Sequence, residues 1–505
     1  MIPFKFTVEL KEHQKKAIQF TLKNPNSIIC IETGGGKTAC TLGQAMLFLA
    51  QGKVDKVIQV VTKKSKHSFK GDIEKLTTLK EEQIQYISSE NDLCDIAIDD
   101  NKIIGVIQYE YIKMIPIENW IKFFKSKRVL VQLDEYHRCK SPLAELFISQ
   151  GSNGVVLSEK MTIHLTQLSN VLYSIRPFIT YLTGYTATPL TKNLDDLFWL
   201  CSLAKPGIFQ DSLLYFYNKY IAYSVALIPI KKGSLRKRTM INKYGYKNTE
   251  ELIGVLSTIC FNYFPPKKIN FIKKYYDSLE IMPDYKKAVR GILDTYNERK
   301  LNEETGEKED KEFSARLLDA QYVLNNSKAK QDCLLEVLKE TIDKGVLIYC
   351  SYYNTVDIVK NILIKHHIPY KEISGRTSDT QCKNSMDWFN GNPKGKVVIL
   401  TEAGAQSINL QSTDSIIYYD IPTIPKTFIQ SFGRISRIGS KYSKFNCYII
   451  MSEGTVDEYR YEYLGSNHET IQFIQGNPNF LPSGELKSFN TTLLKRLRDK
   501  FLWNK

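Results

Sequence analysis

The sequence has no apolar run of the roughly 18 residues that a membrane span requires. Its first ten residues lack a basic segment followed by an apolar one, so they do not predict a secretory signal. The ten cysteines are scattered and no pair is spaced as CxxC, which gives no support to a zinc site or a thioredoxin-like centre. Scattered thiols are typical of a reducing compartment, so we expect no membrane partner and a place in the cytoplasm.

Acidic residues are also in short supply, with 54 Asp and Glu against 69 Lys and Arg, and the formal net charge is +15. A basic surplus favours polyanions as partners, because each Lys or Arg set against a phosphate releases a counterion. Charge alone also allows the alternative, a basic protein that has no polyanion as a partner. Hydrophobic residues make up 43% and charged residues 24%, as in ordinary globular proteins, and the 505 residues predict two to four domains.

Short apolar runs rich in β-branched residues alternate with helical segments in two parts of the chain. The runs are Ser27–Ile31, Lys56–Val61, Ile103–Ile107, Arg128–Leu133 and Tyr181–Gly184, and later Gly345–Cys350, Val397–Thr401, Ser415–Tyr419 and Phe445–Ile450. Buried strands separated by helices predict parallel sheets with helices on both faces. We therefore expect an α/β protein with two lobes, over residues 1–203 and 326–468.

Two intervals lack this alternation. Residues 204–325 are rich in Tyr and Lys, and we predict a mainly helical insertion or linker there. This interval carries a basic cluster that either binds nucleic acid or is a solvated loop, formed by Lys231, Lys232, Arg236, Lys237 and Arg238. Residues 469–505 are predicted to be a short tail that includes a basic amphipathic helix over 493–502.

A glycine cluster after the first apolar run predicts a phosphate-binding loop. Glycines let backbone N–H groups close around phosphate oxygens, and the start of the following helix adds positive potential. Lys37 is expected to bind the β- and γ-phosphates, and the Thr38 hydroxyl to ligate Mg²⁺. The general pattern has a first glycine where Ile31 stands, so a glycine turn without a ligand is the alternative. The predicted nucleotide contacts are Thr33, Gly34, Gly35, Gly36, Lys37 and Thr38.

Paired carboxylates follow the run that ends at Leu133. A strand would carry Asp134 and Glu135 to its carboxyl end, where ligands of open α/β sheets bind. Asp134 is then expected to hold Mg²⁺ and Glu135 to orient or deprotonate the attacking water. His137 either relays between the nucleotide and a second site or caps the following segment, and both interpretations stay open.

Eight segments follow one another in the order found in a known family. They read ELKEHQKKAI, IETGGGKT, DEYHRCKSP, LTGYTATPL, VLIYCSYYNTVD, ISGRTSDTQCKNSMDWFN, TEAGAQSINL and QSFGRISRIG. Together they resemble superfamily-two helicases of the Swi/Snf-like branch, in a compact form similar to phage or viral helicases. Ser407 and Ser436 depart from the Gly and His that the family usually has. The interval 204–325 and the tail match nothing in the family.

The resemblance implies two RecA-like lobes that use ATP and Mg²⁺. It implies that Gln14 reads adenine and that Thr38 and Asp134 hold the metal. The implied catalytic residues are Lys37, Asp134, Glu135, Gln430, Arg434 and Arg437. The two arginines are three residues apart and would share a helix face as arginine fingers, unless they only pair with carboxylates on their own lobe.

Contacts to a nucleic-acid backbone, which position without reading sequence, are expected from Lys63, Lys64, Tyr109, Ser351 and Thr401. The two lysines could equally be solvated surface charge. The implied function is that of an ATP-dependent DNA helicase or translocase that acts on duplex, forked or branched DNA, in replication, recombination or repair. An RNA-directed helicase, or a nucleic-acid-binding scaffold with weak ATPase activity, remains the alternative. Such a protein would lie in the cytoplasm or on the nucleoid, or in a host's cytoplasm if viral.

Overall fold

The chain folds into two compact units. The computed structural model describes residues 3–32, 34–63, 65–139, 143–150, 156–164, 166–187, 195–229, 237–263, 268–301, 317–404, 408–422, 425–436 and 440–474. The first unit is built mainly from Met1–Ala222 and Tyr246–Pro265, and the second from Tyr223–Gly245 and Pro266–Thr470.

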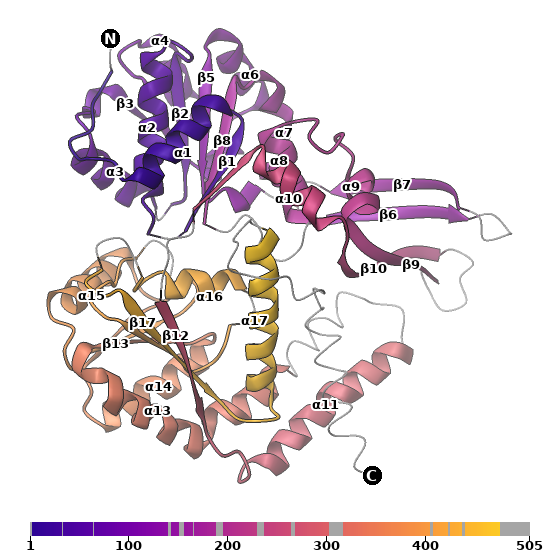
Figure 1. The fold of residues 1–505 in the computed structure, drawn as a ribbon, viewed down its shortest axis with the longest axis vertical. Helices are drawn as coiled ribbons and strands as arrows, with labels where there is room; N and C mark the ends of the chain where they lie inside the picture. The colour runs from indigo at the N-terminus through magenta and orange to yellow at the C-terminus, as the bar shows by residue number, and fades with distance from the viewer. Residues whose placement is uncertain are drawn as a thin grey trace. The chain divides into compact units, whose positions relative to one another are not determined.

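The first unit contains a seven-stranded sheet in which every pairing is parallel, in the order β11-β1-β8-β5-β2-β4-β3 (Figure 1). Its central strands are buried along their whole length, as expected of a sheet covered on both faces. The strands are β1 (Ser27–Ile31), β2 (Lys56–Val61), β3 (Ile84–Ile87), β4 (Ile104–Gln108), β5 (Val129–Asp134), β8 (Tyr181–Thr186) and β11 (Cys260–Tyr263).

Helices connect and cover these strands. Phe48 of α2 packs with Val57 and Val61 of β2 in one core cluster, and burial of each such side chain contributes roughly 1.5–3 kcal/mol. The helices are α1 (Glu12–Lys23), α2 (Lys37–Ala50), α3 (Ser65–Leu76), α4 (Glu90–Ile98), α5 (Tyr109–Ile112), α6 (Ile117–Ser126), α7 (Gln167–Ile175), α8 (Asp195–Ala204), α9 (Leu213–Tyr220) and α10 (Thr249–Ser257).

Two small two-stranded sheets lie outside the large ones. β6 (Leu143–Gln150) pairs antiparallel with β7 (Val156–His164). β9 (Ile221–Pro229) pairs with β10 (Lys237–Tyr246). Only residues 230–236 join these last two strands, too few for a parallel crossover, so β9 and β10 form a hairpin.

The second unit contains a six-stranded, wholly parallel sheet in the order β12-β17-β16-β13-β15-β14 (Figure 1). The strands are β12 (Lys268–Tyr275), β13 (Val346–Tyr349), β14 (Tyr370–Ile373), β15 (Val397–Leu400), β16 (Ser415–Tyr418) and β17 (Lys444–Met451). The helices are α11 (Met282–Leu301), α13 (Lys328–Thr341), α14 (Tyr353–Lys365), α15 (Asp379–Gly391), α16 (Pro425–Phe432) and α17 (Val456–Ile474), with a further helix over 317–326.

Side chains of the second sheet alternate between two cores, because successive residues of a strand point to opposite faces. Leu347 and Tyr349 of β13 belong to the core that includes Phe389 of α15, whereas Val346 and Ile348 belong to the core that includes Val337 of α13. The second sheet is therefore buried on both faces.

The predicted two lobes with parallel sheets are confirmed, and each apolar run that we interpreted as a strand forms one. The interval 204–325 differs from a separate helical insertion. It contains α9, α10 and α11, but β11 extends the first sheet and β12 the second, and β9 and β10 form the hairpin. α17 continues to Ile474, past the predicted start of the tail at 469, and residues 493–502 lie outside the described residues. Among the described helices, none is both long and apolar enough to cross a membrane.

Candidate nucleotide-binding site

The glycine loop joins β1 to α2 in a backbone path that requires glycine. Gly34 and Gly36 have φ values of 84° and 79°, in the left-handed region that other residues rarely adopt. At Gly35, an added Cβ would lie 2.2 Å from Cγ2 of Ile31, so no side chain fits. The Gly35 N–H donates to the carbonyl oxygen of Glu32 at 2.9 Å and closes the turn. Thr33 lies outside the described residues.

Helix α1 packs directly on this loop. Nε2 of His13 lies 2.9 Å from the Gly35 carbonyl oxygen, which can only accept, so this nitrogen carries the proton. The His13 ring stacks on Tyr263 of β11, with ring centroids 3.9 Å apart. Nε2 of Gln14 lies 3.5 Å from the carbonyl oxygens of both Gly35 and Gly36. Gln14 is thus placed beside the loop, and its contact with adenine stays a prediction.

Lys37 and Thr38 form the first turn of α2, where backbone N–H groups are not used within the helix. Both side chains are half-buried. The Lys37 ammonium donates to the carbonyl oxygen of Ile31 at 3.4 Å, a long hydrogen bond that a phosphate could readily replace. The start of this helix therefore offers an anion both its N–H groups and a positive charge.

Asp134 ends β5 and Glu135 follows it, as the sequence predicted. Burial, and next the charge of Glu135, raise the pKa of Asp134 to about 7, while the positive charge of Lys37 opposes this. The charges of Lys37 and Glu135 therefore have opposite effects on the pKa of Asp134. Glu135 has a φ of 49°, a left-handed conformation that costs energy in a non-glycine residue and is found more often at functional sites.

His137 connects the carboxylates to the end of β8. Its Nδ1 lies 3.3 Å from Oε2 of Glu135 and 3.1 Å from Oγ1 of Thr186. Its side chain is buried. This geometry favours the relay interpretation of His137 over a helix-capping role, because the imidazole touches both the predicted water-orienting group and a different strand end.

Tyr109 has a different position from the one we predicted. Its side chain is only 2% exposed, and its hydroxyl donates to the carbonyl oxygen of Asp134 at 2.6 Å. A buried ring does not favour contact with a nucleic-acid backbone. Tyr109 instead supports the strand end that carries the carboxylates, and the sequence offered no signal for this because an aromatic after an apolar run is common.

The oxygen donors of this site fit Mg²⁺. The Thr38 hydroxyl and the Asp134 carboxylate are hard oxygen ligands. A metal ion would also oppose the burial and the repulsion by Glu135 that raise the pKa of Asp134. Within the described part of the chain, no cluster of three or more His, Cys, Asp or Glu could hold a metal ion. Any metal would therefore need phosphate oxygens or water as further ligands, as Mg²⁺ usually does in nucleotide sites.

Arg434 follows α16 in the second unit and is 4% exposed. Its Nη1 donates to the carbonyl oxygen of Ile408 at 3.1 Å, and its own carbonyl accepts from the N–H of Leu410 at 3.2 Å. These bonds attach the arginine segment to the segment after β15. The side chain of Gln430 and all of Arg437 lie outside the described residues, so the arginine-finger role stays a prediction.

The predicted nucleic-acid contacts of the second unit lie at the carboxyl ends of its strands. Ser351 follows β13, and its N–H donates to the carboxylate of Asp420. Thr401 follows β15, is 5% exposed and accepts the N–H of Gly404 at 3.4 Å. The Ser351 hydroxyl is itself buried, so neither hydroxyl is freely exposed in this structure.

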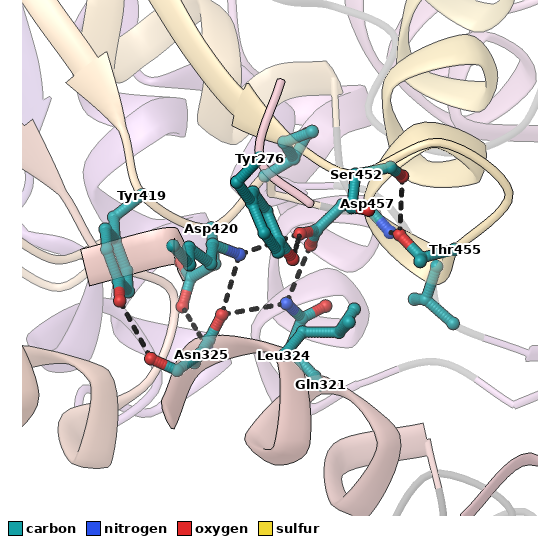
Figure 2. Close-up of polar contacts among 12 residues, drawn as sticks. Tyr276, Gln321, Leu324, Asn325, Tyr419, Asp420, Ser452, Thr455 and Asp457 are labelled. Carbon is teal, nitrogen blue, oxygen red and sulfur yellow. Dashed lines mark hydrogen bonds and ion pairs between the residues drawn. The ribbon is translucent and has the colours of Figure 1, made fainter. Parts of the chain in front are cut away.

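A buried polar network holds these strand ends (Figure 2). Asn325 donates to Asp420 at 3.3 Å and accepts from Gln321 at 3.0 Å, and Gln321 donates to Asp457 at 2.8 Å. Tyr276, which follows β12, donates to Asp457 at 2.9 Å, and Tyr419 donates to the carbonyl oxygen of Asn325 at 2.8 Å. None of these residues was singled out from the sequence.

The remaining candidates for nucleic-acid contacts are basic residues, and only some of them are among the described residues. Lys63 is exposed between β2 and α3, which suits both a phosphate contact and solvated charge. Lys237 and Arg238 begin β10, directly after the connection of the hairpin. Lys64, Lys231, Lys232 and Arg236 lie outside the described residues.

A glycine loop at the carboxyl end of one parallel strand, with paired carboxylates at the end of the next strand but one, defines a P-loop nucleoside triphosphatase fold. Residues 7–190 match the family described as "Type III restriction enzyme, res subunit", and residues 329–439 match "Helicase conserved C-terminal domain". The chain is therefore similar to helicases over both of these segments. Its place on the Swi/Snf-like branch of superfamily two stays a prediction. The phage or viral likeness stays a prediction.

Several curated proteins are similar to the chain. The "Uncharacterized ATP-dependent helicase YqhH" of Bacillus subtilis is 24% identical over 385 residues, which cover 68% of this chain and 66% of the relative. Human "DNA repair and recombination protein RAD54B" is 31% identical over 26% of this chain and 14% of its own length. The Dictyostelium discoideum "Probable ATP-dependent RNA helicase ddx18" is 31% identical over 25% of this chain and 21% of its own length.

A solved structure, the Sulfolobus solfataricus SWI2/SNF2 ATPase core in complex with double-stranded DNA, matches with 17% identity and a TM-score of 0.38. The match covers 94% of this chain and 95% of that chain. The chain spans about two thirds of the first curated relative and much smaller shares of the other two.

Proposed function

We propose that this chain is an ATP-dependent DNA helicase or translocase, which hydrolyses ATP to move along DNA and to remodel duplex, forked or branched DNA. The observation that carries the proposal is the placement of the predicted groups in the first unit. Lys37 begins α2 directly after the glycine loop, Glu135 follows Asp134 at the end of β5, and His137 connects Glu135 to Thr186. A site for hydrolysis is thereby attached to a neighbouring strand end that can respond to it.

Each residue has a distinct part in this proposal. Lys37 and the N–H groups at the start of α2 bind the phosphates, and Thr38 with Asp134 holds Mg²⁺, which neutralises charge that develops on the γ-phosphate. Glu135 orients the attacking water and accepts its proton. Tyr109 keeps the Asp134 backbone in place, since its hydroxyl bonds the carbonyl of that residue.

DNA is the proposed track because the net charge is +15 and because one relative is named for DNA repair and recombination. Another relative is named as a probable RNA helicase, so RNA is the competing track. A nucleic-acid-binding scaffold with weak ATPase activity is the other alternative.

The experiment compares steady-state ATP hydrolysis without nucleic acid and with single strands, duplex, a fork, a four-way junction and RNA. We expect stimulation by DNA, and an affinity for DNA that falls steeply with salt as counterions are released. Stimulation by RNA alone would replace DNA as the track. Binding without stimulation by any nucleic acid would leave the scaffold alternative.

We further propose that the basic cluster Lys231, Lys232, Arg236, Lys237 and Arg238 binds phosphates of forked or branched DNA. Its last two residues begin β10, and its other residues fall in the connection between the two strands of the hairpin. The five positive charges fall within eight residues of the sequence, a spacing that suits several neighbouring phosphates.

The test neutralises all five residues to Gln and measures affinity against salt for a fork and for a single strand. We expect weaker binding with a shallower salt slope, a larger loss on the fork, and nearly unchanged ATPase activity without DNA. The matched control neutralises five exposed lysines of the first unit, which should have a smaller effect: Lys75, Lys80, Lys113, Lys122 and Lys125. Equal losses on fork and single strand would reduce the cluster to a general grip, and no loss would exclude it from binding.

A further inference from the structure

A buried polar junction lies beneath the phosphate-binding loop in the first unit. It is centred on Gln44, which lies two helical turns after Lys37 on α2 and is fully buried. Its side chain meets Gln132 of β5, and Thr183 and Tyr185 of β8, which are also buried. The junction thus joins the helix that begins the loop to the two strands whose ends carry the carboxylates and Thr186.

Every polar atom of the Gln44 side chain is used. Its Nε2 donates to Oγ1 of Thr183 at 2.8 Å. Its Oε1 accepts from Nε2 of Gln132 at 2.8 Å and from the Tyr185 hydroxyl at 2.7 Å. Gln132 also donates to the backbone carbonyl of Thr41, at 2.9 Å, so β5 is attached to α2 twice.

The attached residues are close to the catalytic groups along the chain. Gln132 stands two residues before Asp134 on β5, and Tyr185 pairs in register with Asp134 on the neighbouring strand. Thr186, which His137 contacts, follows Tyr185 directly. A shift of α2 along or across the sheet would therefore break this junction and would also change the separation between Lys37 and Asp134.

We propose that Gln44 is a positioning residue for ATP hydrolysis, which fixes the start of α2 against the ends of β5 and β8 so that phosphate and carboxylate groups keep a productive separation. This inference rests on the proposed function. Hydrogen bonds suit the task because they have a defined length and direction, whereas apolar contacts between a helix and a sheet allow sliding.

The same sheet provides a matched control. Gln59 of β2 is buried to a similar degree and lies directly beside Gln132 in the register between β2 and β5. Its Oε1 has no hydrogen-bond partner, so Gln59 does not join the junction. Replacing Gln59 by Met removes a buried amide from the same layer without disturbing the link between α2 and the strands.

The experiment compares the full chain with Gln44→Met and with Gln59→Met, and measures kcat and KM for ATP, nucleotide affinity without turnover, and thermal stability. We expect Gln44→Met to lower kcat about tenfold to a hundredfold, because small misplacements of reacting groups have effects of this size. KM and nucleotide affinity should change much less, since the loop itself remains. Gln59→Met should keep the wild-type kcat.

Tyr185→Phe provides a second variant, because it removes one hydroxyl that bonds Gln44 and keeps the ring. It should lower kcat in the same direction by a smaller factor, and it decides the question if Gln44→Met fails to fold. Wild-type kcat in a folded Gln44→Met or in Tyr185→Phe, even with lower thermal stability, would overturn the positioning role. A wild-type chain without ATPase activity would instead overturn the proposed function itself.

Discussion

Removing one partner of the buried ion pair in the second unit should destabilise that unit strongly. Nζ of Lys330 lies 2.8 Å from Oδ2 of Asp457, and both side chains have no exposed surface. Lys330→Met would leave the Asp457 carboxylate with only two neutral side-chain donors, Tyr276 and Gln321. An uncompensated buried charge of this kind costs about 3–5 kcal/mol.

The pair differs from the exposed ion pairs of the same unit. Lys274 of β12 and Glu340 of α13 also form a short contact, but their side chains are 28% and 47% exposed. Solvent screens such a pair, so Lys274→Met should cost less than about 1 kcal/mol. This variant is the matched control, since it removes the same functional group from the same unit.

Hydrogen exchange resolved by segment is the appropriate assay, because a chain of two compact units need not unfold in one step. In Lys330→Met, the protected amides of α13 and α17 should exchange about a hundred to a few thousand times faster, which corresponds to 3–5 kcal/mol. Amides of the first unit should not change. The double variant Lys330→Met with Asp457→Leu should cost less than the sum of its single variants, because it leaves no lone charge. Additive single effects, or a loss no larger than that of Lys274→Met, would refute the reasoning.

We expect four further results from variants in the two units. Lys37→Ala should abolish ATP hydrolysis and leave the melting temperature unchanged, since the ammonium has only a long bond to lose; normal turnover would remove the loop from the mechanism. Glu135→Gln should bind ATP and stop turnover, which nucleotide affinity measured beside hydrolysis would check. Thr186→Val removes the hydroxyl that His137 contacts, so stimulation of the ATPase by DNA should fall about tenfold while hydrolysis without DNA persists; equal losses in both would contradict the relay. Burial raises the pKa of Asp420, so its contribution to stability is present at acid pH and is lost as the pH rises through the raised value. The stability of the wild type relative to Asp420→Asn, from unfolding near the usual carboxyl pKa of about 4 and at pH 8, should therefore be greater at the lower pH.

The two parallel sheets could be predicted because their strands are buried on both faces. Strands such as Val57–Val61 appear in the sequence as unbroken apolar runs, and each run ends near a turn or a charged residue. Edge strands gave no such signal. β11 reads CFNY and β12 reads KINFIKKY, and the lysines of β12 suit an edge strand, which must avoid pairing with other chains.

The hairpins escaped prediction for a different reason. A hairpin that is not buried on both faces has no unbroken apolar run in its sequence. The pairing of its strands also depends on two segments that a turn separates. The run IAYSVALIP of β9 ends in a proline before the basic cluster, and this proline is a turn signal. The last two residues of the cluster, Lys237 and Arg238, begin the next strand, β10.

In the candidate nucleotide site, the sequence located the glycine loop before α2 and the paired carboxylates at the end of β5, because their chemistry is specific. A glycine loop with Lys37 and a pair of carboxylates, each at the end of a strand in one lobe, are typical of nucleotide sites and rare elsewhere. The supporting roles of neighbouring residues were not predicted. Tyr109 and His13 form hydrogen bonds to the backbone carbonyl oxygens of Asp134 and Gly35. Every residue has such a carbonyl, so the sequence does not show which one is the partner.

Buried polar side chains can nevertheless be recognised in the sequence where they interrupt an apolar pattern. This signal could have located the network around Gln132 in the first unit and the one around Lys330 in the second. Gln132 interrupts the apolar run RVLVQL, and Lys330 lies on the buried face of α13 with Cys333, Leu334 and Val337. A polar group on such a face must have partners, because leaving it unsatisfied costs about 1–3 kcal/mol or more for a charge. The partners of Gln132 are Thr41 and Gln44 of α2, and those of Lys330 are Asn325 and Asp457. In each unit these hydrogen bonds hold a helix against a neighbouring segment in a defined position, because hydrogen bonds have a set length and direction whereas apolar contacts do not.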